Sequence, residues 1–303
     1  MNHRTTMPTL VFLVCLLMGA GTVSSQQPIS GSYMGQKPPG LIPEKFMPGV
    51  VSTDDHVEFI FTISRDGNEI LLTRSIEGAD VIMSSKRSPE GWSAPQAVEA
   101  LNDVGAFEQH WSPERDRVYF SRMASPPGVE FEDPPKTREE EAMLVGVWYM
   151  DRLDSRWSEP VYCTHGMYVT TTRDGTIYTT DIRGPVGVSC SRLIDGKYSD
   201  LQMLGGGVND PASGVHPCVD PDETFIVFDS QREGGYGKGD LYVCFRQADG
   251  VWSDAVNLGE AINSEGTEFC PSLSPDGRYL FYSSEADIYW VDIQVIENLR
   301  PEK

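Results

Sequence analysis

Histidines and glutamates recur along this chain, each a few residues before a short turn sequence. The histidines that follow residue 25 are His56, His110, His165 and His216, and the glutamates in the same zone are Glu58, Glu108 and Glu268. Neutral imidazole and carboxylate groups are ordinary ligands of zinc, manganese and iron. One such donor from each unit of a repeat would assemble a divalent-metal site, so these residues are the first candidates for chemistry and ligand binding.

The spacing of these donors from their turns divides them. Glu108 and His216 each lie six residues before the turn residue of their repeat, and Glu58 and Glu268 each lie eight residues before it. The other three histidines, His56, His110 and His165, lie ten, four and nine residues before their turn residues. We therefore do not expect the four imidazoles to lie in one plane. Glu108, His216 and Glu268 are therefore the metal candidates. The alternative is a channel lined by polar side chains and bridging water. The metal candidates do not belong to an HExxH motif.

A glycine-rich segment, 231–240, supplies two further candidates. It joins two predicted strands and precedes no helix, so it is not a phosphate-binding loop. Arg232 and Tyr236 lie within it, and loops on rigid scaffolds often carry binding residues, so we expect them to contact a sugar or a peptide. Aspartates that recur before the third strand of a repeat are interpreted as turn-forming, with calcium as the alternative: Asp80, Asp240 and Asp287.

The elements that must position these residues are most clearly seen in the stretch 268–292. It contains an apolar run, the turn sequence Ser274-Pro275-Asp276-Gly277, an aromatic strand and a third strand. Proline presets φ for a turn and glycine accepts positive φ, so this sequence predicts a small antiparallel meander. Equivalent turn residues recur at intervals of 48, 60, 48 and 54 positions: Asp66, Glu114, Asp174, Asp222 and Asp276. The long interval contains an insertion, 124–142, whose acidic run predicts a solvated, mobile loop.

The stretch 268–292 resembles the WD40-like, TolB-type (PD40) propeller repeat, whose hallmark is an SPDG hairpin followed by an aromatic strand and an Asp-Ile-Tyr strand. The resemblance covers about residues 43–293. It implies an all-β fold with a single propeller, and the intervals favour five four-stranded blades, with six blades as the alternative. The expected blades span about 56–101, 102–163, 164–206, 207–262 and 263–293.

The fifth repeat lacks a fourth strand, which leaves an open sheet edge. Closed architectures remove such edges. In the first two repeats we expect the fourth strand to begin with a Trp-Ser sequence, at Trp92 and at Trp157, and the segment Phe46-Met47-Pro48-Gly49-Val50 resembles that pattern. We therefore expect an N-terminal strand over 44–52 to pair beside 287–293 and complete the last blade. The propeller domain then spans 44–303, with a short helix or tail after residue 293.

The N-terminus predicts export. Arg4, an apolar run over 10–17 and small residues up to Ser25 have the pattern of a secretory signal peptide, 1–25, followed by an extended tether, 26–43. We expect a secreted or periplasmic monomer without a membrane span. Of the cysteines after residue 25, five in number, at least one is unpaired within a monomer, and buried free thiols are expected.

Charge restricts the partner class. The formal net charge is −21, from 24 basic and 45 acidic residues, which argues against nucleic acid because phosphate binding needs a basic face. We expect a non-catalytic propeller that binds a protein or a carbohydrate through the channel-mouth face bearing the histidines and the insertion. The alternative is a metal-assisted carbohydrate-active enzyme, a lyase or hydrolase, with its site in the channel and a divalent metal as cofactor. Oligogalacturonate lyases, which resemble this repeat class, hold a metal with channel histidines.

Overall fold

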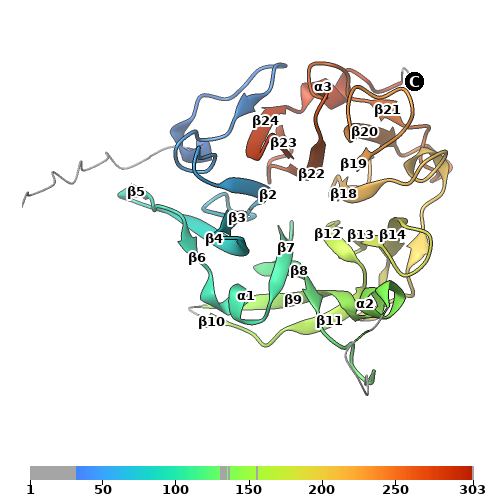
Figure 1. Cartoon of the computed structure of the whole chain (residues 1–303), viewed down its shortest axis with the longest axis horizontal. Coiled ribbons are helices and arrows are strands. Elements are labelled where there is room, and N and C mark those ends of the chain that lie inside the picture. Colours follow the sequence, from blue (N-terminus) through green and yellow to red (C-terminus); the bar gives the residue numbers. More distant parts are fainter. Residues whose placement is uncertain (1–31, 130–134, 136, 155, 302–303) are drawn as a thin grey trace, which may run out of the picture.

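The computed structural model describes residues 32–129, 135, 137–154 and 156–301. Figure 1 shows five antiparallel sheets around a central axis, with β2, β7, β12, β18 and β22 nearest to that axis. The chain is an all-β, five-bladed propeller, as the repeat count predicts, and the six-bladed alternative is not realised. Within the described ranges no helix is long and apolar enough to cross a membrane. The predicted signal peptide, 1–25, lies outside them.

Each blade contains four strands that follow one another outward from the axis. Blade 1 contains β2 (Val57–Ile63), β3 (Glu69–Ile76), β4 (Ala79–Ser88) and β6 (Gln96–Ala97), with β5 (Gly91–Trp92) beside the end of β4. Blade 2 contains β7 (Ala106–Trp111), β8 (Arg117–Met123), β9 (Val145–Leu153) and β11 (Val161–His165), with β10 (Arg156–Trp157) beside the end of β9. Blade 3 contains β12 (Met167–Thr171), β13 (Ile177–Asp181), β14 (Gly187–Ser191) and β17 (Gln202–Met203), plus the hairpin of β15 (Leu193–Ile194) and β16 (Lys197–Tyr198).

The last two blades lack such additions. Blade 4 contains β18 (Val215–Val219), β19 (Phe225–Ser230), β20 (Asp240–Phe245) and β21 (Val256–Asn257). Blade 5 contains β22 (Glu268–Leu273), β23 (Tyr279–Ser284), β24 (Asp287–Asp292) and the N-terminal β1 (Glu44–Lys45). The helical segments are η1 (Ser32–Gly35), α1 (Glu99–Asp103), α2 (Arg138–Leu144), η2 (Gly206–Val208) and α3 (Gln294–Glu297). The short helix expected after residue 293 is thus present as α3.

The turns between the first two strands of each blade have the chemistry that their sequence predicts. In blade 5 the Ser274 hydroxyl donates to the Asp276 carboxylate at 2.7 Å, and Gly277 adopts a φ of 68°. Ser64 and Asp66 make the same contact in blade 1. Such side-chain bonds and a glycine with positive φ close a tight hairpin. These five turns lie on one face of the propeller, here called the turn face.

The propeller is closed by the N-terminal strand, as expected, although the pairing is shorter than 44–52. Only β1 pairs with β24, through Glu44 opposite Trp290 and Lys45 opposite Tyr289. The chain then turns away at Met47, which has a φ of 45°, so the ladder ends there. The Phe46 side chain is fully buried and packs against Phe61 of blade 1 and Phe281 of blade 5, with ring centroids 5.0 and 5.2 Å apart.

Two expectations about irregular segments need correction. The Trp-Ser sequences at Trp92 and Trp157 form only two-residue strands, and the outer strands β6 and β11 begin after Pro95 and Pro160, because proline cannot donate to the ladder. The insertion is not loop throughout, since it contains α2, and Thr137 caps that helix in a reciprocal capping box with Glu140.

Candidate functional site

The innermost strand of every blade has a β-bulge at the same position. The bulged residues are Ile60, Glu108, Tyr168, His216 and Cys270, each six residues before its turn residue and each with a φ between 47° and 54°. Non-glycine residues rarely adopt this left-handed conformation, and a bulge reorients its side chain relative to the rest of the strand. We call these five residues the channel ring.

The channel ring fills the centre of the propeller. Ile60, Tyr168 and Cys270 come from three different blades, yet they pack in one buried cluster in which none is more than 4% exposed. The Tyr168 phenol crosses from blade 3 and donates to the Pro271 carbonyl of blade 5 at 2.6 Å. The channel is therefore closed at this level by side chains.

The remaining ring members bring charge into this centre. His216 Nδ1 lies 2.8 Å from Asp229 Oδ1, and Asp229 lies on β19 of the same blade. The Glu108 carboxylate accepts from the Ser121 hydroxyl at 2.8 Å and from the Tyr168 backbone N–H at 2.5 Å. Glu108 and Asp229 are both buried, so two carboxylates and one imidazole share a poorly solvated space.

The protonation of these three groups is coupled. Burial raises the pKa of Glu108 and the pKa of Asp229, against the opposing effect of the His216 charge. Burial alone would lower the pKa of His216, but the adjacent Asp229 carboxylate and the more distant Glu108 raise it overall. The arrangement favours a protonated imidazole held by Asp229.

Asp229 occupies a position that has a structural role in the other blades. The backbone N–H of a ring residue donates to a side chain on the second strand of the preceding blade: Ile60 to Ser283, Tyr168 to Ser121, His216 to Thr180, and Cys270 to Asp229. Three of these acceptors are hydroxyls and only Asp229 is a carboxylate. Asp229 thus replaces a hydroxyl acceptor by a carboxylate in a contact that joins neighbouring blades.

Glu58 and Glu268 are equivalent to each other, as their spacing predicts, but they do not join the channel ring. Both are fully buried. Glu58 accepts from the backbone and hydroxyl of Thr53 and from Arg74, while Glu268 accepts from the backbone and hydroxyl of Ser264 and from Ser284. Their carboxylates fasten the loop that enters the innermost strand.

His110 also has a structural position. Its Nε2 accepts from the Thr171 backbone N–H of the next blade at 3.2 Å. Thr62 and Thr170, at the same level of their own blades, accept the equivalent N–H groups through their hydroxyls, at 3.1 and 3.2 Å. Burial lowers the pKa of His110 to about 3, so the ring is neutral and acts as a hydrogen-bond acceptor.

The other two histidines lie apart from the ring. His56 Nδ1 is 3.3 Å from the Thr53 hydroxyl in the loop before β2. His165 lies on β11, the outermost strand of blade 2, and its ring packs edge-on against Tyr162. Burial and the positive charge of Arg183 lower the pKa of His165. The structure therefore does not bring the four histidines together.

Arg232 is held by the fold, whereas Tyr236 is not. The Arg232 guanidinium donates to the carbonyls of Val208 and Ala212, at 2.6 and 3.0 Å, and lies over the rings of Phe228 and Tyr242. It is thus committed to joining η2 and the following loop to blade 4. The Tyr236 side chain is 49% exposed and remains accessible.

The recurrent aspartates, which the sequence indicates as turn-forming, differ in their contacts. Asp240 accepts from the backbone N–H groups of Tyr236 and Gly237, Asp80 accepts from Ser75, and Asp287 pairs with Lys45. Across the described ranges no group of three or more His, Cys, Asp or Glu side chains is placed to share a metal ion. The cysteines in these ranges are free thiols, and all except the half-buried Cys163 are buried.

Sequence reasoning missed Asp229, Tyr168, Ile60 and Cys270 as members of this centre. The signal for the ring residues was present, because all five share the spacing of six that was recognised only for Glu108 and His216. Asp229 gave no such signal, since its place beside His216 depends on the cross-strand register of a bulged ladder.

No family model and no curated protein matches this chain. Solved structures with a similar fold include a putative TolB from Agrobacterium tumefaciens, with 19% identity, a TM-score of 0.46, and coverage of 77% of this chain and 72% of that one. A TolB from Acinetobacter baumannii has 11% identity and a TM-score of 0.45 over 78% of this chain, which spans only 54% of that protein. A gluconolactonase from Xanthomonas campestris has 12% identity and a TM-score of 0.43, with coverage of 82% and 94%. The structural relatives of this propeller thus include TolB-like proteins and an enzyme.

Proposed function

We propose that this protein is an exported, non-catalytic propeller that binds a partner on its outer surface. The observation that carries the proposal is the filled channel. Ile60, Tyr168 and Cys270 meet at the axis, so a substrate has no path through the centre.

The polar groups of the channel support the same conclusion. Glu108, His110 and Asp229 each accept a backbone N–H from a neighbouring blade. A buried backbone N–H that loses its acceptor is costly, so these side chains are needed for the fold. A catalytic acid or base must instead be free to reach a substrate.

The surfaces that remain for binding are the two faces. The face opposite the turns carries the exposed Tyr236 and the insertion with α2. The turn face carries two adjoining hollows over blade 1, which are lined in part by arginine and aromatic side chains. A rigid ring that presents loops and hollows in this way suits partner recognition.

The competing function is a metal-assisted carbohydrate-active enzyme that uses Glu108 and His216, and metal analysis separates the two. We expect purified protein to contain no stoichiometric transition metal, and titration with Zn²⁺ or Mn²⁺ to show no saturable binding that depends on the channel. One equivalent of metal that disappears in both Glu108→Gln and His216→Asn would contradict the proposal. His56→Asn is the matched control, because it removes an imidazole outside the ring.

A further inference from the structure

Two hollows on the turn face meet over the first turn of blade 1. One is a cavity of about 260 Å³ between blades 5 and 1, and the other is a cavity of about 330 Å³ between blades 1 and 2. Arg65, Asp66 and Arg87 line both, so the two hollows adjoin across these side chains. We call them together the blade 1 groove.

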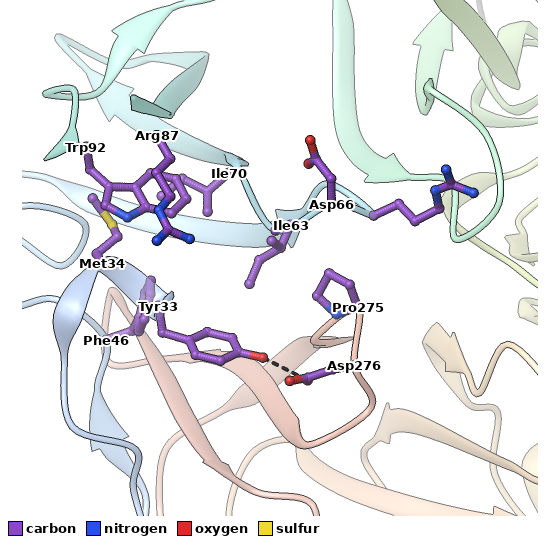
Figure 2. Close-up of a pocket in the computed structure, with 12 residues that line it drawn as sticks. Tyr33, Met34, Phe46, Ile63, Asp66, Ile70, Arg87, Trp92, Pro275 and Asp276 are labelled. Atoms are coloured by element: carbon purple, nitrogen blue, oxygen red, sulfur yellow. Dashed lines mark hydrogen bonds between the residues drawn. The ribbon is translucent and has the colours of Figure 1, made fainter. Parts of the chain in front are cut away.

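The first half of the groove has an apolar floor. Met34, Phe46, Ile63 and Ile70 line it. Figure 2 shows Arg87 and Trp92 on one wall and Tyr33 and Asp276 on the other, with Ile63 and Pro275 between them. The hydroxyl of Tyr33 is already bonded to Asp276 at 2.7 Å. This half is suited to a large apolar side chain and supplies few free hydrogen-bonding groups from its floor.

The second half collects positive charge in a strongly acidic protein. Five of the 24 basic residues line it: Arg65, Lys86, Arg87, Arg115 and Arg152. Arg152 is committed to Glu69 and lies over the rings of Trp111 and Trp157. Lys86 is 3.7 Å from Glu69. These two cations therefore already have carboxylate partners.

Within the part of the chain that the structure describes, Arg87 and Arg115 have no carboxylate partner. Both side chains are exposed, and among the described residues neither guanidinium has a hydrogen bond or an ion pair. Each presents donors in a planar fork that matches a carboxylate. The acids that line the groove have other partners: Asp66 accepts from Ser64 and Asn68, and Asp276 accepts from Tyr33 and Ser274. Glu69 pairs with Arg152 and Lys86, and Asp116 lies 3.9 Å from Arg152.

We propose that the blade 1 groove binds an acidic peptide segment of a protein partner. Carboxylates of the segment pair with Arg87 and Arg115, and a neighbouring large apolar side chain enters the cavity between Tyr33 and Trp92. This inference rests on the proposed binding function and names the partner class and the surface. A peptide fits better than a glycan because the apolar floor would leave sugar hydroxyls without partners. Self-association through these arginines is one of the outcomes that the test below distinguishes from peptide binding.

Selection from a displayed library of random decapeptides tests the proposal with the full mature chain. We expect the wild-type protein to enrich peptides that combine acidic residues with an aromatic or large aliphatic residue. The affinity of the best peptide, measured by fluorescence anisotropy, should fall by about tenfold or more in Arg87→Glu and in Arg115→Glu, and it should fall with added salt, because each contact is an ion pair.

The matched control is Arg138→Glu, which makes the same charge change on exposed α2, away from the turn face. It should leave peptide affinity unchanged, and circular dichroism should show that all three variants melt as the wild type does. Enriched peptides without acidic residues, or equal affinity in the Arg87 and Arg115 variants, would overturn the proposal. Two further results would also overturn the proposal. One is that oligogalacturonate, and not a peptide, binds at these arginines. The other is that the protein self-associates and that Arg87→Glu abolishes this self-association. These outcomes leave the metal measurement unaffected, so failure of the groove and failure of the proposed function are distinguishable.

Discussion

Individual residues of the channel are best understood as substitutions within a repeated hydrogen-bond scheme. At one level Thr62, His110 and Thr170 each accept a backbone N–H from the next blade. At the next level Asp229 stands where the other blades have Ser or Thr. An unusual histidine or aspartate in the channel therefore replaces a hydroxyl acceptor and does not by itself mark a catalytic site.

His110 gives the simplest test of this interpretation. We expect His110→Thr to preserve more stability than His110→Val, because threonine keeps an acceptor for the Thr171 N–H and valine has the same shape without one. The difference in unfolding free energy should be about 1–3 kcal/mol, the cost of a buried donor without a partner. Urea denaturation monitored by tryptophan fluorescence measures it. Equal stability of the two variants would show that the hydrogen bond is dispensable.

Glu108, His216 and Asp229 predict an unusual pH dependence. The pKa of each is raised by folding, so the folded state binds protons more tightly than the unfolded state. The stabilising contribution of the two carboxyl groups is complete below about pH 4, and that of His216 below about pH 6.5, their unfolded values. Each contribution is lost as pH rises through the raised folded pKa.

A variant without titratable groups at these positions isolates that effect. In Glu108→Gln/His216→Gln/Asp229→Thr, threonine at 229 restores the hydroxyl found in other blades. We expect the melting temperature of the wild type, relative to this variant, to decrease as pH rises from 5 to 9. A constant or increasing difference would contradict the assigned pKa directions. NMR titration of the His216 ring gives an independent measurement in the wild-type protein.

At the scale of elements, the closing strand determines whether blade 5 is complete. Phe46 follows the two paired residues of β1 and is buried among Phe61, Phe281 and Trp290. We expect Phe46→Ala to destabilise the protein by about 3–5 kcal/mol, as is typical for a buried aromatic residue. Ile42→Ala is the control, because Ile42 is 75% exposed, and it should change stability by less than about 0.5 kcal/mol. Thermal unfolding of both variants checks the difference, and similar melting temperatures would refute the closure role of Phe46.

The elements that sequence predicts well are those with local chemical signals. The turns at Asp66 and Asp276 are set by their own side chains and by the glycine that follows. The Trp-Ser segments misled because Trp92 and Trp157 resemble strand residues while the following prolines interrupt the ladder. The helix α2 was missed although Thr137 and Glu140 form a local capping box, because the acidic run was interpreted as a loop.

At the scale of the whole molecule, blade number follows from counting turns, and the closed ring follows from the need to pair the last edge. The filled channel did not follow, because it depends on five bulges acting together. Tyr168 reaches Pro271 across the axis, a contact between residues 103 positions apart. The same applies to the blade 1 groove, which gathers Tyr33, Arg87 and Asp276 from distant parts of the chain.

We propose that the channel of this propeller is structural and that its turn face binds the partner. One comparison tests both parts: the affinity of the selected acidic peptide for the channel variant Glu108→Gln and for the groove variant Arg87→Glu. Glu108 accepts two hydrogen bonds inside the ring, and Arg87 lies on the open groove. We predict that Glu108→Gln is less stable but binds the peptide as the wild type does, whereas Arg87→Glu is as stable as the wild type and binds at least about tenfold more weakly. Loss of binding in Glu108→Gln with full binding in Arg87→Glu would contradict the account.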